Sequence, residues 1–294
     1  MKILSLGAVL LDQVAPVDRF PKEDDEVFVS DLQLLPGGSA ANFAVIASRL
    51  GVETGFIGKI GDDFFGEYLL KDLKEEKIDT DAVPKSSLPT GTVFIAVRKD
   101  GERMMFAHSG AANDLSEQDI NLDYLAKFDH LHLADLENVA ILSYAAKKFT
   151  GTISINPGAL MAEKPKETLE LIKLVDVLIC SKNEAMQLSG AKTITDALEF
   201  FFKLGPEVVV ITRGAESSLA FDGKCKFDVP VFKVPVLDAT GAGDAFSAAF
   251  ICRYYEKKDI EESLRFANAT ASITVQNPGA REGLKDKAQV EALL

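Results

Sequence analysis

The segment Asp238-Ala-Thr-Gly-Ala-Gly-Asp244 is followed by Ala-Phe-Ser-Ala-Ala-Phe-Ile-Cys-Arg-Tyr254, whose aromatic residues recur every four positions. That spacing is typical of a buried helix face, so the glycines lie at the start of a helix. Glycines permit a tight turn, and the free amide N–H groups of the first turn form an anion site together with the helix dipole. Asp244 then lies beside the anion, where it can accept the proton of an attacking hydroxyl group. The simpler interpretation is that Asp244 only caps the helix.

A second glycine segment, Pro36-Gly-Gly-Ser-Ala-Ala-Asn42, opens another helix, rich in small residues, that ends at Gly51. Paired glycines allow a ligand to approach the backbone closely. Asn42 lies inside the helix, where asparagine has a poor propensity, so its amide is expected to have a partner. That partner is either a ligand hydroxyl group or a neighbouring loop.

The rest of the chain predicts an α/β fold with a central, mostly parallel sheet flanked by helices and a small antiparallel β lid. From about residue 129 onward, short apolar runs alternate with helical patterns. Asp100-Gly101 lies between two strand-like runs and predicts a hairpin. We expect one domain over residues 1–294, with lid segments at about 13–35 and 90–109. Strands are expected at 3–6, 26–35, 54–57, 92–98, 103–108, 130–133, 152–155, 175–180 and 208–212, and helices at 40–50, 63–76, 138–149, 165–174, 183–189 and 194–204.

Composition excludes several classes of protein. The 294 residues include 45 acidic and 32 basic side chains, and the net charge of -13 disfavours a general nucleic-acid binder. No run approaches the roughly 18 apolar residues that a membrane-spanning helix requires. The three cysteines form no C-x-x-C pair, which favours a reducing, cytoplasmic location. His130 and His132 would share a strand face without a third ligand nearby, so they are interpreted as structural residues.

Together, the two glycine segments resemble the two signatures of the ribokinase-like (PfkB) family of carbohydrate kinases, and the likeness runs through nearly the whole chain. The resemblance implies that Asp244 is the general base and that the backbone of Gly241, Ala242 and Gly243 forms an anion hole. It further implies that the phosphate acceptor is bound by Asp12, Gly38, Asn42 and Glu137, with Asp135 as a weaker candidate than Glu137.

For the nucleotide, the resemblance implies a site that includes Ser181, Glu184, Thr212, Gly214 and Asn268. Asn268 can equally be an exposed amide on a helix surface. The family's Asn-x-x-Glu motif falls on Ser181–Glu184, so Glu184 is retained while Ser181 replaces the asparagine. Glu184 is expected to help to hold Mg²⁺ through water, with Asn183 as a partial substitute for the missing amide. A loop for a monovalent cation such as K⁺ can include Asp238 and the segment from Gln276 to Gly283.

The expected activity is transfer of the γ-phosphoryl group of ATP, with Mg²⁺, to a primary hydroxyl group of a sugar, as in ribokinase or fructokinase. A nucleoside kinase is the alternative within the family, and a non-catalytic sensor of sugars or nucleotides is the alternative outside enzymes. A sugar acid would require a basic residue in the pocket, which the sequence does not identify. Apolar lid residues predict a homodimer through the lid; they are Val27, Val29, Val93, Ile95 and Phe106.

Overall fold

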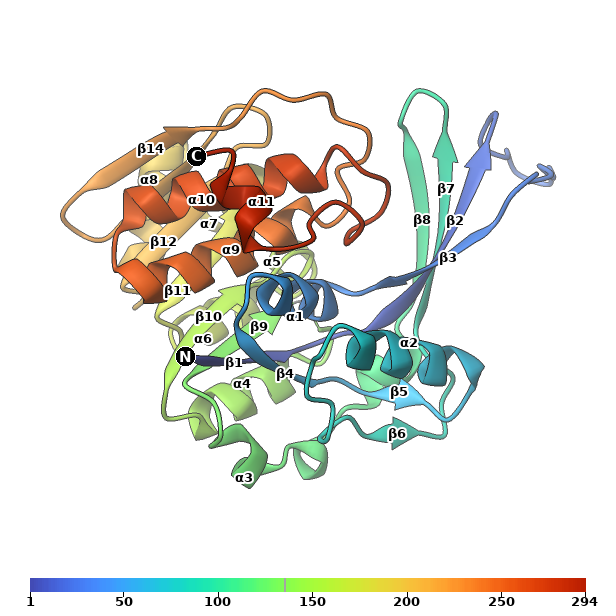
Figure 1. The fold of residues 1–294 in the computed structure, drawn as a ribbon, viewed down its shortest axis with the longest axis horizontal. Coiled ribbons are helices and arrows are strands. Elements are labelled where there is room, and N and C mark those ends of the chain that lie inside the picture. Colours follow the sequence, from blue (N-terminus) through green and yellow to red (C-terminus); the bar gives the residue numbers. More distant parts are fainter. Residues whose placement is uncertain (135) are drawn as a thin grey trace.

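The computed structural model describes residues 1–134 and 136–294, and its centre is an eight-stranded sheet (Figure 1). The strand order is β14-β13-β12-β11-β10-β9-β1-β4, with parallel pairing from β12 to β4 and antiparallel pairing at β13 and β14. The strands are β1 (Lys2–Leu6), β4 (Glu53–Ile57), β9 (His130–Ala134), β10 (Thr152–Asn156), β11 (Val177–Ser181), β12 (Val208–Thr212), β13 (Ser217–Phe221) and β14 (Lys226–Pro230).

Helices cover both faces of this sheet because its strands are apolar on both sides. One face carries α1 (Ser39–Arg49), α9 (Ala242–Lys257), α10 (Ile260–Thr274) and α11 (Lys287–Glu291). The other carries α4 (Val139–Lys148), α5 (Leu160–Glu163), α6 (Pro165–Ile172), α7 (Lys182–Ser189) and α8 (Ile194–Phe202). The peripheral elements are α2 (Phe64–Glu75), α3 (Leu122–Leu125), the short strands β5 (Ile60–Gly61) and β6 (Lys85–Ser86), and the 3₁₀ turns η1 (Gly110–Asp114) and η2 (Glu117–Asp119).

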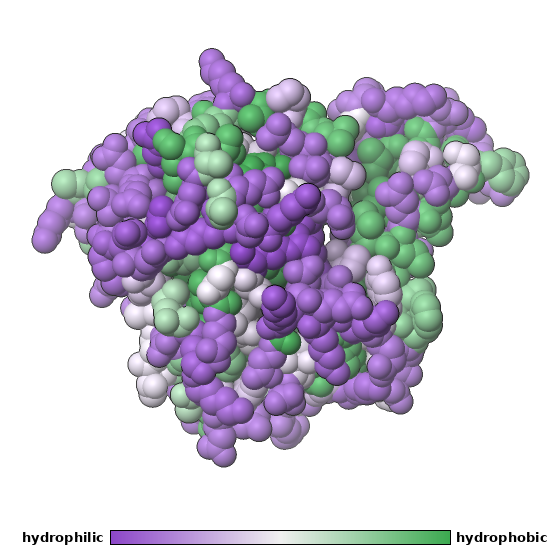
Figure 2. Space-filling model, in the orientation of Figure 1, coloured by the Kyte–Doolittle hydropathy of each residue, from purple (hydrophilic) through white to green (hydrophobic). Residues whose placement is uncertain are grey.

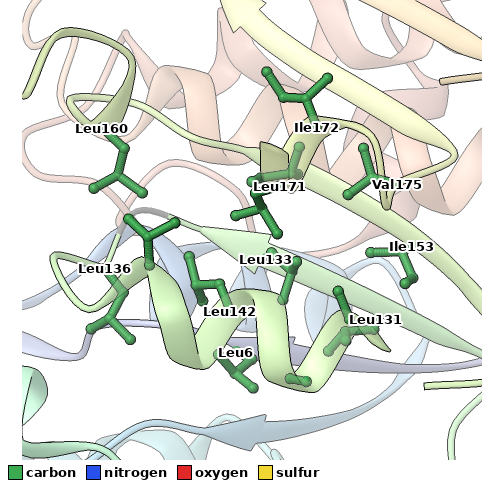
Figure 3. Packing of buried hydrophobic residues seen from close by; sticks show 14 of the residues in the cluster. Leu6, Leu131, Leu133, Leu136, Leu142, Ile153, Leu160, Leu171, Ile172 and Val175 are labelled. Carbon is green, nitrogen blue, oxygen red and sulfur yellow. The ribbon is translucent and has the colours of Figure 1, made fainter. Parts of the chain in front are cut away.

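Successive side chains of each central strand point to opposite faces of the sheet and pack in two different hydrophobic cores. In β11, Val177 and Ile179 pack with α1, α9 and α10, whereas Leu178 packs with the helices of the opposite face. Figure 3 shows this second core, where Leu131 and Leu133 of β9 point toward leucines of α4 and α6. Truncating one such fully buried leucine to alanine costs about 2–5 kcal/mol, so the strand ends that carry polar residues have a rigid support.

A four-stranded lid stands beside the main sheet and is ordered β3-β2-β7-β8 (Figure 1). Its strands are β2 (Leu10–Val17), β3 (Gln33–Gly37), β7 (Thr92–Arg98) and β8 (Arg103–His108). The predicted hairpin is confirmed, since Val97 pairs with Arg103 and Gly101 has a φ of +87°. Register places Asp12, Val14 and Ile95 on one face of the lid, and it places Leu34, Phe94 and Phe106 on the other.

The α/β prediction is confirmed, and the differences concern edges and the lid. Residues 26–32 form no strand, because only the segment from Gln33 onward finds a partner in β2. The lid begins earlier than predicted, at Leu10, and its β2–β7 pair is parallel. The antiparallel edge strands β13 and β14 were not predicted either, because they lack a long apolar run.

Both predicted structural histidines lie in the sheet interior. His130 contacts the hydroxyl groups of Thr152 and Ser154 at 2.8 and 2.7 Å, and His132 contacts Ser154 at 2.8 Å. The ring of His132 also stacks on Phe43. Burial lowers the pKa of His130 to about 3, so its ring stays neutral at ordinary pH. These contacts support a role in packing.

Candidate active site

The polar ends of the parallel strands lie along one edge of the sheet, as expected where α/β proteins bind ligands. β11 and β12 end with the paired residues Ser181 and Thr212, and β10 ends at Asn156. The Asn156 amide donates to Ser247 in α9 over 3.1 Å and so attaches that helix above β10. The start of α9 therefore lies between the ends of β11 and β12 on one side and those of β9 and β1 on the other.

The start of α9 has the geometry that an anion site requires. Gly241 is the N-cap with a φ of +72°, and no side chain caps the helix. A Cβ atom on Gly241 would lie 2.4 Å from the Cβ of Ala280, so the loop after α10 packs tightly on this turn. Gly243 is exposed, which leaves the backbone of the first turn open to a ligand.

Asn42 and Asp244, which the sequence places 202 residues apart, contact each other directly. The Asn42 side-chain amide donates to the Asp244 carboxylate, with 2.8 Å between Nδ2 and Oδ2. Asn42 is only 5% exposed, and its other side-chain atom, Oδ1, accepts from Nε of Arg281 at 2.8 Å. The two glycine segments thus meet at one point, and the partner predicted for Asn42 consists of Asp244 and Arg281.

Asp12 lies in β2 at the base of the lid rather than in a loop. A Cβ atom on Gly37 would lie 2.4 Å from Oδ2 of Asp12, so glycine at position 37 makes room for this carboxylate. Burial raises the pKa of Asp12 to about 6; the charge of Asp238 also raises it, and the charge of Arg281 lowers it. Gly38 has a φ of +92° and packs against the carbonyl group of Ala8.

A cleft of about 800 Å³ separates the lid from the main body. The inner face of the lid lines it, including Asp12, and the segment from Val236 to Thr240 lines the opposite wall. Arg103 of β8 reaches across, donating to Thr240 Oγ1 at 2.7 Å and lying 3.7 Å from Asp238. The sequence did not identify a basic residue that could bind a sugar acid. In the structure, the basic side chains that line the cleft are Arg98, Lys99 and Arg103.

Ser181 and Glu184 form a capping box at the start of α7. The backbone N–H of Ser181 donates to Glu184 Oε2 at 2.7 Å, and the Glu184 N–H lies 3.3 Å from the Ser181 hydroxyl. Among the described residues, Glu184 Oε1 has no hydrogen-bond partner, which fits a carboxylate that holds the water shell of Mg²⁺. No cluster of three His, Cys, Asp or Glu side chains suited to a metal occurs in the described part of the chain.

The turn after β12 supplies the other nucleotide residues of the prediction. Thr212 ends the strand, and Gly214 has a φ of +57° with no atom within 4 Å of an added Cβ. Asn268 is buried rather than exposed, and its amide donates to the carbonyl groups of Val229 and Pro230 at 3.1 and 3.3 Å. Its side chain thus supports β14, and any contact with a nucleotide would come from the surface of α10 around it.

The structure separates one acceptor candidate, Glu137, from Asp12. Glu137 is exposed and borders a smaller hollow beside His108, Asn113 and Asp114, not the large cleft. Asp135 lies outside the described residues. Asp238, suggested for a cation loop, accepts from Thr240 N and Gly279 N, both at 2.9 Å, and so joins the two segments of that loop.

Arg281 is the residue near this site whose role sequence reasoning missed. It lies inside the segment from Gln276 to Gly283, which the sequence suggested only for a monovalent cation. A lone basic residue in a loop carries no signal of burial, so nothing in the sequence singles out Arg281.

Comparisons with known proteins find similarity over nearly the whole chain. The model for the pfkB family of carbohydrate kinases matches residues 1–287. A ribokinase from Bacillus subtilis is 33% identical over 298 residues, covering 99% of both chains. The crystal structure of a Thermotoga maritima ribokinase superposes with a TM-score of 0.91 at 30% identity, covering 99% of this chain and 98% of that one. An Arabidopsis thaliana ribokinase with ribose and ATP gives a TM-score of 0.88 at 27% identity, with 99% and 97% coverage.

Proposed function

Since this chain belongs to the pfkB family of carbohydrate kinases, we propose that it transfers the γ-phosphoryl group of ATP to the primary hydroxyl group of ribose or a similar sugar. An ATP-dependent sugar kinase is the activity that the family match and the ribokinase relatives support in common. The observation that carries the assignment of residues is the hydrogen bond from Asn42 to Asp244. It joins the segment expected to bind the acceptor to the residue expected to deprotonate it.

In this mechanism the sugar lies against Asp12, Gly38 and Asn42, with its hydroxyl group facing Asp244. The ATP phosphates extend from the ends of β11 and β12 toward the start of α9. The hydroxyl oxygen attacks the γ-phosphorus in line, the bond to the β,γ-bridging oxygen breaks, and Asp244 accepts the proton. Backbone N–H groups from Gly241 to Gly243 stabilise the charge on the transferred group.

Mg²⁺, when bound with ATP, would offset the phosphate charge, and Glu184 is the residue proposed to hold its water shell. Because the transition state of phosphoryl transfer is loose, most proton transfer comes late, so the positioning of Asp244 contributes more than its basicity. The lid would exclude water that otherwise competes with the sugar. Activation by K⁺ at the loop joined by Asp238 is tested by replacing K⁺ with a large organic cation.

Asp244→Asn tests the proposed base. We expect kcat to fall by about 10²- to 10⁴-fold, because the amide cannot accept the proton, with ATP binding largely retained. Asp259→Asn is a matched control, since Asp259 caps α10 by accepting from Glu262 N at 2.9 Å and takes no part in the site. If Asp244→Asn retains kcat within threefold, Asp244 is not the base.

A panel of acceptors with Mg-ATP separates the alternatives. Transfer to ribose or fructose supports the proposal, whereas preference for nucleosides would indicate a nucleoside kinase. Arg103 in the cleft is a reason to include a sugar acid and a sugar phosphate. Absence of transfer to every member, with binding retained, would indicate a sensor.

A homodimer through the lid is part of the proposal. Leu34, Phe94 and Phe106 share the outer lid face and are 41%, 37% and 63% exposed. Figure 2 shows hydrophobic residues gathered over the lid. Ile95, which the sequence analysis placed in the dimer interface, lines the cleft instead, so it does not belong to the outer face. Sedimentation at micromolar concentration should give a dimer that Phe106→Lys weakens, and a monomeric wild type would refute it.

The described residues contain no helix both long and apolar enough to cross a membrane. The cytoplasm is the proposed location, and it is supported by three free cysteines, of which Cys180 and Cys252 are buried. Detection of these thiols as unmodified in protein isolated under alkylating conditions would test it.

A further inference from the structure

Arg281 is a buried cation whose guanidinium group contacts three other parts of the fold. It is 5% exposed and lies in the loop between α10 and α11. Nε donates to Asn42 Oδ1 at 2.8 Å, and Nη2 donates to the Gly37 carbonyl oxygen at 3.2 Å. Nη1 forms an ion pair with Asp72 of α2. One guanidinium group therefore joins the C-terminal loop to α1, to the end of β3 and to α2.

The chemistry of these groups fixes the direction of the Asn42 amide. A guanidinium group has only donors, so the atom of Asn42 that faces it must be the carbonyl oxygen. The amide nitrogen must then face Asp244, whose ionised carboxylate only accepts. Reversing the amide would place an oxygen against a carboxylate oxygen and a nitrogen against a guanidinium group, so both contacts would be repulsive.

We propose that Arg281 is a positioning residue for phosphoryl transfer: it fixes the orientation of Asn42 and, through Asn42, that of the Asp244 carboxylate. This rests on the proposed role of Asp244 as the base. Arg281 donates to both Asp72 and Asn42, and Asn42 in turn donates to Asp244, so the Asn42 amide has one favourable direction. Displacing a reacting group by about 1 Å can cost about 10²-fold in rate, which makes such orientation matter.

A purely structural role for Arg281 is separable, because a second arginine already anchors the same loop. Arg49 Nη1 donates to the carbonyl groups of Arg281 and Leu284, the latter at 2.8 Å. Its Nε donates to Glu76 at 2.9 Å, so it resembles Arg281 in having both carbonyl and carboxylate partners. Arg49 forms no contact with Asn42, so it is the matched control.

The test compares Arg281→Lys with Arg49→Lys. Lysine retains the charge but lacks the planar fork, so it cannot hold Asn42, Gly37 and Asp72 in the same three directions. We expect Arg281→Lys to lower kcat by about 10- to 100-fold with the KM for ATP changed less than threefold, whereas Arg49→Lys leaves kcat within threefold. Equal loss of kcat in both variants, in proportion to lost stability, would overturn the proposal.

A double-mutant cycle shows whether Arg281 acts through Asn42. In an Asn42→Ala background, Arg281→Lys should cost less than twofold further in kcat, because the amide it orients is gone. Full multiplication of the two losses would overturn the proposal. If Arg281→Lys does not fold, Asp72→Asn takes its place in the same cycle, with a smaller expected loss of about 2- to 10-fold.

Asp244→Asn, measured in parallel, separates a failure of the proposed base, Asp244, from a failure of the proposed positioning role of Arg281. If Asp244→Asn retains activity, the proposed function of that carboxylate fails. If Asp244→Asn loses activity while Arg281→Lys keeps it, only the positioning role of Arg281 fails.

Discussion

The proposed acceptor side and the proposed nucleotide side of the site are held together in different ways. On the acceptor side, Asn42 and Arg281 are 239 residues apart in sequence, and their contact also involves Asp244. On the nucleotide side, Ser181 and Thr212 are paired ends of neighbouring strands, and the capping box joins Ser181 to Glu184, only three positions further along the chain. The first depends on side chains from distant segments, whereas the second follows from the sheet and a local helix start.

This difference predicts how each side fails. A change to one member of the acceptor side removes or reverses a hydrogen bond on which the next member depends, so its effects spread. A change on the nucleotide side stays local, because backbone pairing of the strands holds the positions of Ser181 and Thr212. Substitutions of the acceptor side should therefore cost more activity per unit of lost stability.

Among the substitutions that test the contrast between the two sides, Gly37→Ala is expected to have the largest effect on activity. The new Cβ would lie 2.4 Å from Asp12 Oδ2, and the side chain of Asp12 can rotate away more easily than the backbone can move. The fold should survive within about 1 kcal/mol, while kcat/KM for the sugar falls by about 100-fold and the KM for ATP is unchanged. Steady-state kinetics with each substrate varied provides the measurement.

Gly51→Ala is the control for Gly37→Ala. Gly37 precedes helix α1, and Gly51 follows the C-terminal end of the same helix. Gly51 has a φ of +88° and no atom within 4 Å of an added Cβ. It should cost about 1 kcal/mol of stability with no change in kinetics. A KM for the sugar within threefold of wild type in Gly37→Ala would show that Asp12 does not bind the acceptor.

Asp12 gives the acceptor side a pH dependence. Its pKa is raised from 3.8 to about 6, chiefly by burial, so the folded protein favours the protonated form. The unfolding free energy should therefore decrease as pH rises from about 4 to 6 and stay lower above that, by up to about 3 kcal/mol. Asp12→Asn should recover this stability at pH 8, but not at pH 3.5, while losing sugar binding.

Catalysis should respond to Asp12 in the opposite direction from stability. Wild-type kcat/KM for the sugar should fall about tenfold per pH unit below 6, because protonation removes an acceptor for sugar hydroxyl groups. Asp12→Asn should lack this dependence. Denaturant unfolding and initial rates at several pH values test both effects. If the gain in unfolding free energy of Asp12→Asn over wild type is no larger at pH 8 than at pH 3.5, the predicted effect of Asp12 on stability is wrong.

The same comparison explains how much the sequence predicted. The strands of the main sheet from β1 to β12 were expected within a few residues, because apolar runs bounded by turn residues identify them locally. Asp244 and the glycines could be named as candidates because their spacing along the chain is itself a signal. Arg281 was missed because its burial results from the packing of α2, β3 and the C-terminal loop, none of which leaves a pattern near residue 281. The lid strand β2 was missed for a related reason, since its partners lie in distant segments.

Glu184→Gln is expected to give the smallest effect and tests the nucleotide side. Glutamine can also complete a capping box, so the unfolding free energy should change by less than about 1 kcal/mol. Loss of the charge should raise the Mg²⁺ concentration needed for half-maximal rate by about 3- to 10-fold, because the carboxylate no longer attracts the hydrated ion. Asp286→Asn is the control, since Asp286 caps α11 by accepting from Gln289 N at 3.0 Å, and it should leave the Mg²⁺ requirement unchanged. If Glu184→Gln instead lowers kcat as much as Gly37→Ala lowers kcat/KM, the nucleotide side is as interdependent as the acceptor side and the contrast between them does not hold.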